Sequence, residues 1–267
     1  MRPSKTKSTR ARSRKLASRK QPAQTQPLPA AIVAAATTAP PPPDQIRATA
    51  SAPLVHVTEK FFAEAVRELT SRDADLAHAV EKYGVPPLWV REPGFSTLVY
   101  IILEQQVSLA SARALYQKLE KAVSPFTPEK FLKLTEAEMR QLGFSRQKSH
   151  YTRLLADAIQ QKQFDLDALH ELHDDHAREK LVALKGIGRW TSDIYLLSAL
   201  RRPDIWPIGD LALATAVQEV KQLRKRPSPE KLEKMSAPWK PFRAIAARLF
   251  WHAYLCKRGQ SSATISL

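Results

Sequence analysis

Two glycines mark the point where one helical pattern ends and another begins, in the stretch LVALKGIGRWTSDIYLL at residues 181–197. Gly186 and Gly188 allow a tight turn there, and the missing side chains let backbone N–H groups approach a ligand closely. The positive end of the second helix points at the same place, so such a helix-hairpin-helix can hold a phosphate oxygen without reading a base sequence. Two glycines between helices also occur at an ordinary C-cap and turn, and the hairpin alone leaves both interpretations open.

A carboxylate follows the hairpin after one further helix and a turn that contains proline and glycine. It is Asp210, in the stretch IWPIGDLALATAV at residues 205–217. An aspartate in front of a helix is most often an N-cap, whose side chain accepts a backbone N–H of the first turn. A fixed carboxylate can also stabilise positive charge that develops on a reacting sugar.

Four motifs in order resemble those of the helix-hairpin-helix (HhH-GPD) DNA glycosylases, and most of all the 3-methyladenine DNA glycosylase II, or alkylbase glycosylase, branch. One is the hairpin followed by Asp210 at the head of the next helix. The others are GFSTLVYIILEQQVSLASA at 94–112, LGFSRQKSHYTRLLA at 142–156 and WKPFRAIAARLFWHAYL at 239–255. The resemblance covers about residues 55–258. It implies an enzyme of base excision repair that binds double-stranded DNA containing damaged bases and rotates the damaged base out of the duplex.

The resemblance implies that Asp210 acts in hydrolysis of the N-glycosidic bond of alkylated purines, of the 3-methyladenine and 7-methylguanine type. Breaking this bond develops positive charge on the sugar, which a carboxylate beside C1′ stabilises while it orients a water. A purine alkylated on N3 or N7 already carries positive charge, so no strong general acid is needed. Bifunctional family members place a Schiff-base lysine directly after Gly-x-Gly-Arg, where this chain has Trp190. We therefore expect a monofunctional glycosylase without lyase activity.

The remaining site residues also follow from the resemblance. Aromatic faces suit an electron-poor cationic base, and the family's base pocket falls on Trp190, Trp251 and Tyr195, although Ile194 is the closer match to the third position. Packing in the core is the alternative for Trp251. Gln105 and Gln106 match the turn that fills the gap left by the flipped base, with Gln106 favoured. The other predicted DNA contacts are Gly186, Ile187, Gly188, Arg189, Thr191 and Lys148.

The single cysteine, Cys256, limits the cofactors. It excludes any site that needs several thiolates, such as a Cys-ligated zinc finger or the four-cysteine iron–sulfur cluster of some bifunctional members. We expect no required cofactor, and the resemblance implies a structural Na⁺ or K⁺ ion on the backbone carbonyls of Val182, Leu184 and Ile187. Three histidines spaced by three, at 170, 173 and 176, could share a helical face as metal ligands. Their segment is short, polar and interrupted by two aspartates, which favours an exposed connection instead.

These motifs require helices to position them. From Leu54 onward, apolar residues recur at three- and four-residue spacing, with Thr, Ser or Asp at N-cap positions. We predict an all-α fold of two helical subdomains, 96–205 with the hairpin and 54–95 plus 206–258, with DNA across the cleft between them. Thr135 and Glu138 predict a capping box. The predicted helices cover residues 58–71, 74–83, 95–105, 108–121, 128–134, 136–141, 146–161, 175–184, 190–199, 211–221, 230–235 and 240–256.

The charge is large and unevenly placed. With 42 Lys and Arg against 26 Asp and Glu, the formal charge is +16 and the pI about 10.1, which indicates a polyanionic partner. Residues 1–20 hold nine of these cations and no acid, and the Pro/Ala-rich stretch after them cannot bury enough apolar area to fold. We predict that residues 1–53 form a disordered basic tail that tethers the protein to DNA, with a transit peptide or a nuclear signal as alternatives. Residues 259–267 are predicted to be a flexible C-terminus.

The longest apolar run, LVYIIL at residues 98–103, is too short to span a membrane. We expect a monomer associated with DNA, in the cytoplasm or nucleoid of a bacterium or in the nucleus of a eukaryote. Two other functions stay open: a noncatalytic helix-hairpin-helix DNA-binding protein, and a glycosylase for other base lesions. Asp210 at the family position argues against the first, and the acid-poor aromatic pocket disfavours the second.

Removal of residues 1–53 should change the electrostatic attraction to DNA and leave the chemistry intact. The deletion takes away ten of the 42 basic residues and none of the four motifs. If three or four tail contacts to phosphates are lost, the slope of log K against log salt falls by about 3. Binding to undamaged duplex, measured by fluorescence anisotropy across a salt series, should show this change. A truncated protein that stays helical but loses single-turnover base excision would contradict the tether interpretation.

Overall fold

The computed structural model describes residues 54–260, and this part of the chain is built from twelve α-helices and two short 3₁₀ helices, without a strand. The predicted all-α class is confirmed, and every predicted helix is present with its ends within three residues of the expected positions. The predicted tail (1–53) and the last residues (261–267) lie outside the described residues. No helix in the described range is long and apolar enough to cross a bilayer.

Hydroxyl side chains cap six of the twelve α-helices in the described residues, and aspartates cap two more, as the sequence predicted. Thr58 accepts the N–H of Phe61, and residues Ser108, Thr127, Ser145 and Ser228 act in the same way on their own helices. At Thr135 the capping box is complete, because Glu138 also accepts the backbone N–H of Thr135 at 2.7 Å. These helix starts are therefore fixed by contacts between residues three positions apart in the chain.

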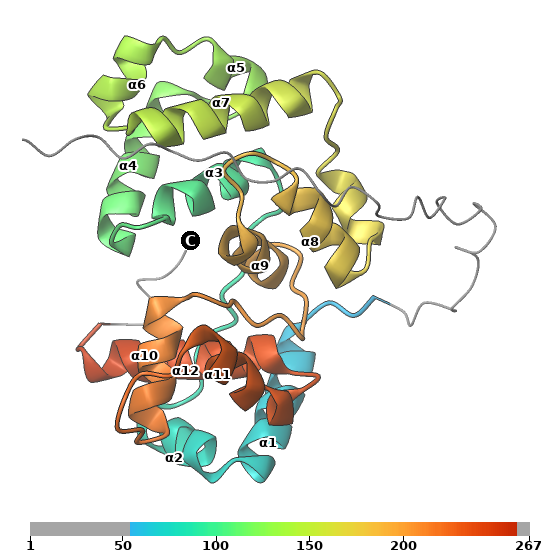
Figure 1. Ribbon diagram of the computed structural model, residues 1–267, viewed down its shortest axis with the longest axis vertical. Helices are drawn as coiled ribbons and strands as arrows, with labels where there is room; N and C mark the ends of the chain where they lie inside the picture. Colours follow the sequence, from blue (N-terminus) through green and yellow to red (C-terminus); the bar gives the residue numbers. More distant parts are fainter. Residues whose placement is uncertain (1–53, 261–267) are drawn as a thin grey trace, which may run out of the picture. The chain divides into compact units, whose positions relative to one another are not determined.

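The helices pack in two groups (Figure 1). In the first, α3 packs against α4, α7 and α9, while α5 and α6 cover α7 and α8 packs on α9. Its members are α3 (Phe95–Glu104), α4 (Leu109–Ala122), α5 (Pro128–Leu132), α6 (Glu136–Leu142), α7 (Arg146–Gln160), η2 (Asp167–Glu171), α8 (Asp174–Val182) and α9 (Arg189–Ser198).

In the second group, α12 packs against α1, α2 and α10. Its members are α1 (Glu59–Arg72), α2 (Ala74–Tyr83), α10 (Leu211–Val220), α11 (Pro229–Met235), η3 (Ala237–Trp239) and α12 (Arg243–Lys257). The chain enters this group at α1, leaves it for α3 to α9, and returns at α10. Residues from both ends of the described range therefore build the same packing group.

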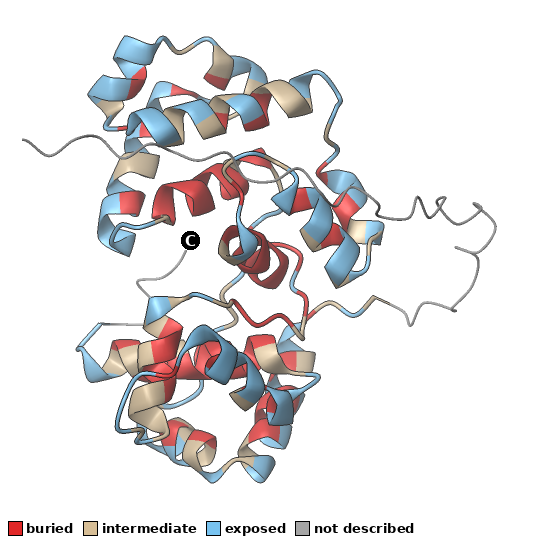
Figure 2. Cartoon of the chain, in the orientation of Figure 1, coloured by how far each residue is buried: buried red, intermediate tan, exposed pale blue. Residues whose placement is uncertain are grey.

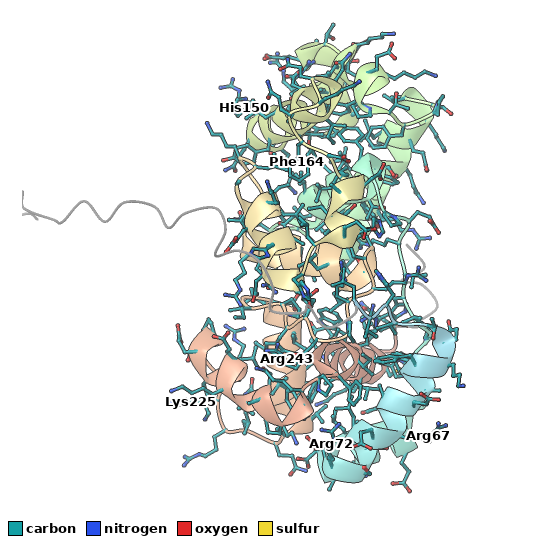
Figure 3. All side chains as sticks on the ribbon, turned by 90° about the vertical axis from the view of Figure 1, so that its right-hand side faces the viewer. Arg67, Arg72, His150, Phe164, Lys225 and Arg243 are labelled. Atoms are coloured by element: carbon teal, nitrogen blue, oxygen red, sulfur yellow. The ribbon has the colours of Figure 1, made fainter. Side chains whose placement is uncertain are left out.

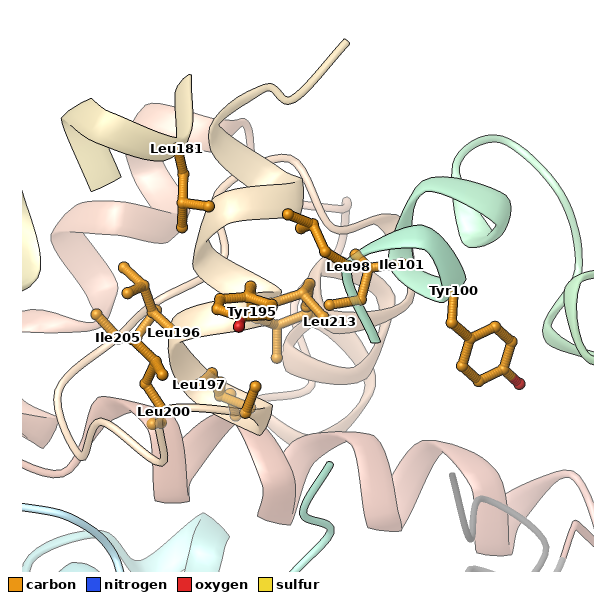
Figure 4. Close-up of a cluster of buried hydrophobic side chains, with 14 of the residues drawn as sticks. Leu98, Tyr100, Ile101, Leu181, Tyr195, Leu196, Leu197, Leu200, Ile205 and Leu213 are labelled. Carbon is orange, nitrogen blue, oxygen red and sulfur yellow. The ribbon is translucent and has the colours of Figure 1, made fainter. Parts of the chain in front are cut away.

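The most buried helices are α3, α9 and α12 (Figure 2). Tyr195 of α9 is fully buried among Leu98, Ile101 and Leu196 (Figure 4), and its hydroxyl accepts the N–H of Gly94 at 3.0 Å. Burial raises the pKa of Tyr195 to about 12. This side chain is therefore a core residue that fixes the start of α3.

A half-buried network joins the start of α2 to the end of α10 and to η3. Asp73 caps α2, and it also accepts the Trp239 indole N–H at 2.8 Å and the Lys221 ammonium at 2.6 Å. Burial raises the pKa of Asp73, but the bonds from Lys221 and Trp239 lower it by more. Trp239 is 3% exposed and is therefore a core residue.

The two hairpin glycines differ in what the fold demands of them. Gly186 has φ +92°, and a Cβ atom there would lie 2.2 Å from Cγ of Tyr151. Gly188 has φ −92° and ψ −179°, and a Cβ atom there would have no neighbour within 4 Å. Of the two hairpin glycines, only Gly186 is required by the fold, because Gly188 has a backbone conformation that any residue adopts.

The stability of two single variants should separate these glycines. Gly186→Ala must strain the backbone and displace Tyr151, so we expect its free energy of unfolding to fall by about 2 kcal/mol or more. Gly188→Ala should change the same quantity by no more than about 1 kcal/mol in either direction. Urea unfolding followed by circular dichroism measures both, and equal losses in the two variants would contradict the turn geometry.

Candidate functional site: a carboxylate beside a helix-hairpin-helix

Asp210 is held by three donors from three helices. Its Oδ1 accepts the backbone N–H of Leu213 at 2.6 Å, so it does cap α10. Trp190 of α9 donates its indole N–H to Oδ2 at 2.9 Å, and Trp251 of α12 donates to Oδ1 at 3.3 Å. The N-cap interpretation and the functional one therefore describe the same side chain. Capping α10 requires only the bond from Leu213. The two indole bonds additionally fix the orientation of the carboxylate.

The turn before α10 presents this carboxylate. Gly209 has φ +88°, which favours glycine, and the N–H of Asp210 points back to the carbonyl of Pro207 at 3.4 Å. Asp210, Trp190 and Trp251 are each half-buried, so each keeps part of its surface accessible to solvent. Leu211 directly follows and is 67% exposed. An accessible carboxylate with two indole rings and an exposed leucine can contact a ligand that has both charged and apolar parts.

The hairpin leaves its second helix open to an anion. At the start of α9 no side chain caps the backbone and no acidic residue stands in the first turn. Its first N–H groups and its dipole are therefore not compensated, which is the arrangement that binds phosphate. The open space beside Gly188 lets a ligand approach these groups. No neighbouring atom among the described residues requires glycine at position 188.

A buried ion pair fixes the two hairpin helices to each other. Arg178 of α8 donates to Asp193 of α9 at 2.7 Å, and the Asp193 side chain is fully buried. Burial raises the pKa of Asp193 while Arg178 opposes that effect. Arg189 is 54% exposed and stands 3.6 Å from the same carboxylate. The sequence analysis missed Arg178 and Asp193, because two charges fifteen positions apart give no signal until the hairpin closes.

The structure places the predicted DNA contacts in two classes. Gly188, Arg189 and Gln106 are exposed, whereas the Thr191 side chain is 1% exposed and accepts a bond from Gln105. Lys148 donates to the carbonyl of Leu103 at 2.6 Å. The two inward-facing polar side chains, Gln105 and Lys148, are turned toward the protein because unpaired backbone carbonyls lie within their reach.

The predicted base pocket is only partly assembled at the surface. Trp190 and Trp251 converge on Asp210, as described above. Tyr195 does not, because its ring is enclosed by the core and its hydroxyl is bonded to the chain before α3. Position 194 offers no substitute, since Ile194 is 8% exposed. Trp190 and Trp251 are therefore the two aromatic residues that this geometry can offer to a base.

The hairpin carbonyls predicted to hold a monovalent ion belong to one turn. The carbonyl of Leu184 accepts the N–H of Ile187 at 3.1 Å, and a carbonyl oxygen retains a second lone pair. Val182 ends α8, where carbonyls lack helical partners. Oxygen ligands of this kind suit Na⁺ or K⁺, so the residues present fit the ion. In residues 54–260 no three His, Cys, Asp or Glu side chains come together, and the three histidines at 170, 173 and 176 form no such group.

The chain is similar in sequence to known proteins. The family described as "HhH-GPD superfamily base excision DNA repair protein" matches residues 99–241. The chain is 28% identical over 208 residues to the alkylbase DNA glycosidase-like protein mag2 of Schizosaccharomyces pombe, covering 74% of this chain and 97% of that protein. It is 26% identical over 186 residues to the putative DNA-3-methyladenine glycosylase YfjP of Bacillus subtilis, covering 67% of this chain and 65% of that protein.

A solved structure shows the same fold. The 3-methyladenine DNA glycosylase Mag1 of Schizosaccharomyces pombe, in complex with abasic DNA, superposes with a TM-score of 0.65 at 26% identity. The match covers 70% of this chain and 95% of that one. The family match includes α9, α10 and the hairpin turn between α8 and α9, and it extends over more than half of the 267 residues. This chain belongs to the HhH-GPD superfamily of base excision DNA repair proteins.

Proposed function

We propose that this chain is a monofunctional DNA glycosylase that flips alkylated purines of the 3-methyladenine and 7-methylguanine type out of duplex DNA and hydrolyses their N-glycosidic bond. The observation that carries the proposal is Asp210. It is a half-buried carboxylate bonded to two indoles, and it follows α9, the second helix of the open hairpin. Relatives named as 3-methyladenine and alkylbase glycosylases support the substrate class.

The carboxylate has room for one more partner. A carboxylate offers about four acceptor positions, and Leu213, Trp190 and Trp251 use three of them. The remaining position can stabilise the positive charge at C1′ or orient a water. As the C1′–N bond breaks, the base leaves with the electron pair, the water oxygen bonds to C1′, and the water's proton passes to the carboxylate or to solvent. The products are a free base and an abasic site.

The two tryptophans have a second task in this proposal. Because each indole N–H is fixed on Asp210, the plane of each ring is fixed as well. A cationic purine rotated out of the duplex would stack on such a face, with each contact contributing about 1–3 kcal/mol. The hairpin would hold a phosphate nearby through the open start of α9, and a Na⁺ or K⁺ ion on its carbonyls would add positive charge beside that phosphate.

Asp210→Asn should strongly reduce the rate of excision and leave the fold intact. An asparagine oxygen can still accept the N–H of Leu213, and asparagine is as good an N-cap as aspartate. The lost negative charge acts mainly in the transition state, so single-turnover release of free bases from methylated DNA should fall about 10²- to 10³-fold. Binding to an abasic-site analogue should change little. Turnover close to that of the wild type would contradict the assigned role.

The chain offers a matched control for this variant. Asp73 is also an N-cap that accepts an indole N–H, from Trp239, and it is paired with Lys221. Asp73→Asn should therefore lower thermal stability by removing a half-buried ion pair, with the excision rate unchanged at saturating enzyme. If both variants lose activity in proportion to stability, Asp210 is only a cap.

The reaction should leave an intact abasic site and no covalent intermediate. A Schiff base requires an amine at C1′, and Trp190 stands where bifunctional relatives carry that amine. Borohydride added during turnover should trap no enzyme–DNA adduct on a denaturing gel, while a bifunctional glycosylase in the same assay should be trapped. Robust trapping would mean that another lysine reaches the sugar.

A further inference from the structure

The turn between α3 and α4 holds one residue in an unusual conformation. Gln106 has φ +58° and is exposed, and Val107 beside it is 46% exposed. A residue other than glycine in the left-handed region is strained and persists only when its surroundings fix it. The backbone conformation of this exposed turn must therefore be maintained by contacts with other parts of the chain.

Two anchors fix the chain just before this turn. Lys148 of α7 donates to the carbonyl of Leu103 at 2.6 Å, where the last carbonyls of α3 lack helical partners. Burial lowers the pKa of Lys148. Arg91 pairs with Glu104 at 2.6 Å, and both side chains are almost completely buried. The end of α3 is therefore tied to α7 and to the segment before α3.

The third anchor joins the turn to the hairpin. The side-chain amide of Gln105 donates to the carbonyl of Gly186 at 3.0 Å and to the hydroxyl of Thr191 at 2.9 Å. Gly186 is the glycine that the fold requires, and Thr191 lies in the first turn of α9. One amide thus contacts both the hairpin turn and the helix that follows it, 81 and 86 positions away in the chain.

We propose that Gln105 is a positioning residue that joins the phosphate-binding hairpin to the α3–α4 turn, so that Gln106 meets the DNA already in the conformation that fills the vacated stack. This inference rests on the proposed function, because it concerns how the chain supports the base flipping that this function requires. A preformed turn requires little ordering on binding, which favours insertion. The same bond transmits any shift of the hairpin on a phosphate directly to the inserting residue. Lys148 supports this arrangement from within the protein.

A double-mutant cycle on the full chain tests this role. The variants are Gln105→Leu, Gln106→Ala and the double variant, each with a duplex that carries 2-aminopurine beside a 7-methylguanine, a lesion of the proposed substrate class. The increase in 2-aminopurine fluorescence reports unstacking during flipping, separately from excision. Each single variant should reduce the flipping equilibrium about 5- to 100-fold, as expected when a buried bond or an inserted group is lost. The double variant should match Gln106→Ala, since Gln105 acts through Gln106.

Two further variants separate positioning from general damage. Gln147→Leu removes an exposed glutamine that donates to the Tyr151 hydroxyl at 3.1 Å, and it should leave flipping unchanged. Thr191→Val removes one acceptor of Gln105 while keeping the side-chain shape, and it should reduce flipping in the same direction by a smaller factor. This variant carries the test if Gln105→Leu does not fold.

Additive losses in the double variant, or normal flipping in both Gln105→Leu and Thr191→Val, would overturn the inference. Failure of the proposed function would look different. A wild-type protein that gives the fluorescence increase but releases no base would refute the glycosylase proposal and still report on the turn. Released base together with additive losses would refute only the positioning role.

Discussion

The three hydrogen bonds on Asp210 connect the parts of this protein on which the proposed chemistry depends. Trp190 belongs to α9, in one group of helices, whereas Leu213 and Trp251 belong to α10 and α12, in the other. The bond from Trp190 can form only when the two groups of helices have packed against each other. The complete set of bonds on Asp210 therefore depends on correct packing of the helices. The same bonds hold the rings of Trp190 and Trp251 beside the carboxylate, where a base could stack.

Two buried arginines support that packing mainly through bonds to backbone carbonyls, and Arg202 also lies 3.5 Å from the Asp174 carboxylate. Arg248 of α12 is fully buried and donates to the carbonyls of Leu197 in α9 and Trp89 before α3. Burial lowers its pKa, and the carbonyls provide the polar surroundings that the charge needs. Arg202 is 1% exposed and binds three carbonyls around η2. Both guanidinium groups satisfy carbonyls near helix ends, so they fix where those helices stop.

Rigidity and accessibility are divided between neighbouring residues. Gly186 is required by the fold, and Gly188 is left open; Gln105 bonds inward, and Gln106 is exposed and strained. In each pair one residue fixes the backbone and the other faces the solvent. A nucleic-acid phosphate or a vacated base stack demands groups that are placed before binding, because ordering them afterwards would cost affinity.

The sequence by itself determined the helices, the hairpin and the Asp210 position, because capping, apolar periodicity and glycine turns act over a few residues. It did not determine where polar side chains point. Tyr195 was expected at the pocket and Lys148 on DNA, yet one is enclosed by the core and the other caps α3. Only the tertiary structure decided these roles. The orientation of a long side chain depends on which unpaired carbonyl or cavity another helix brings near it, and that helix is distant in sequence.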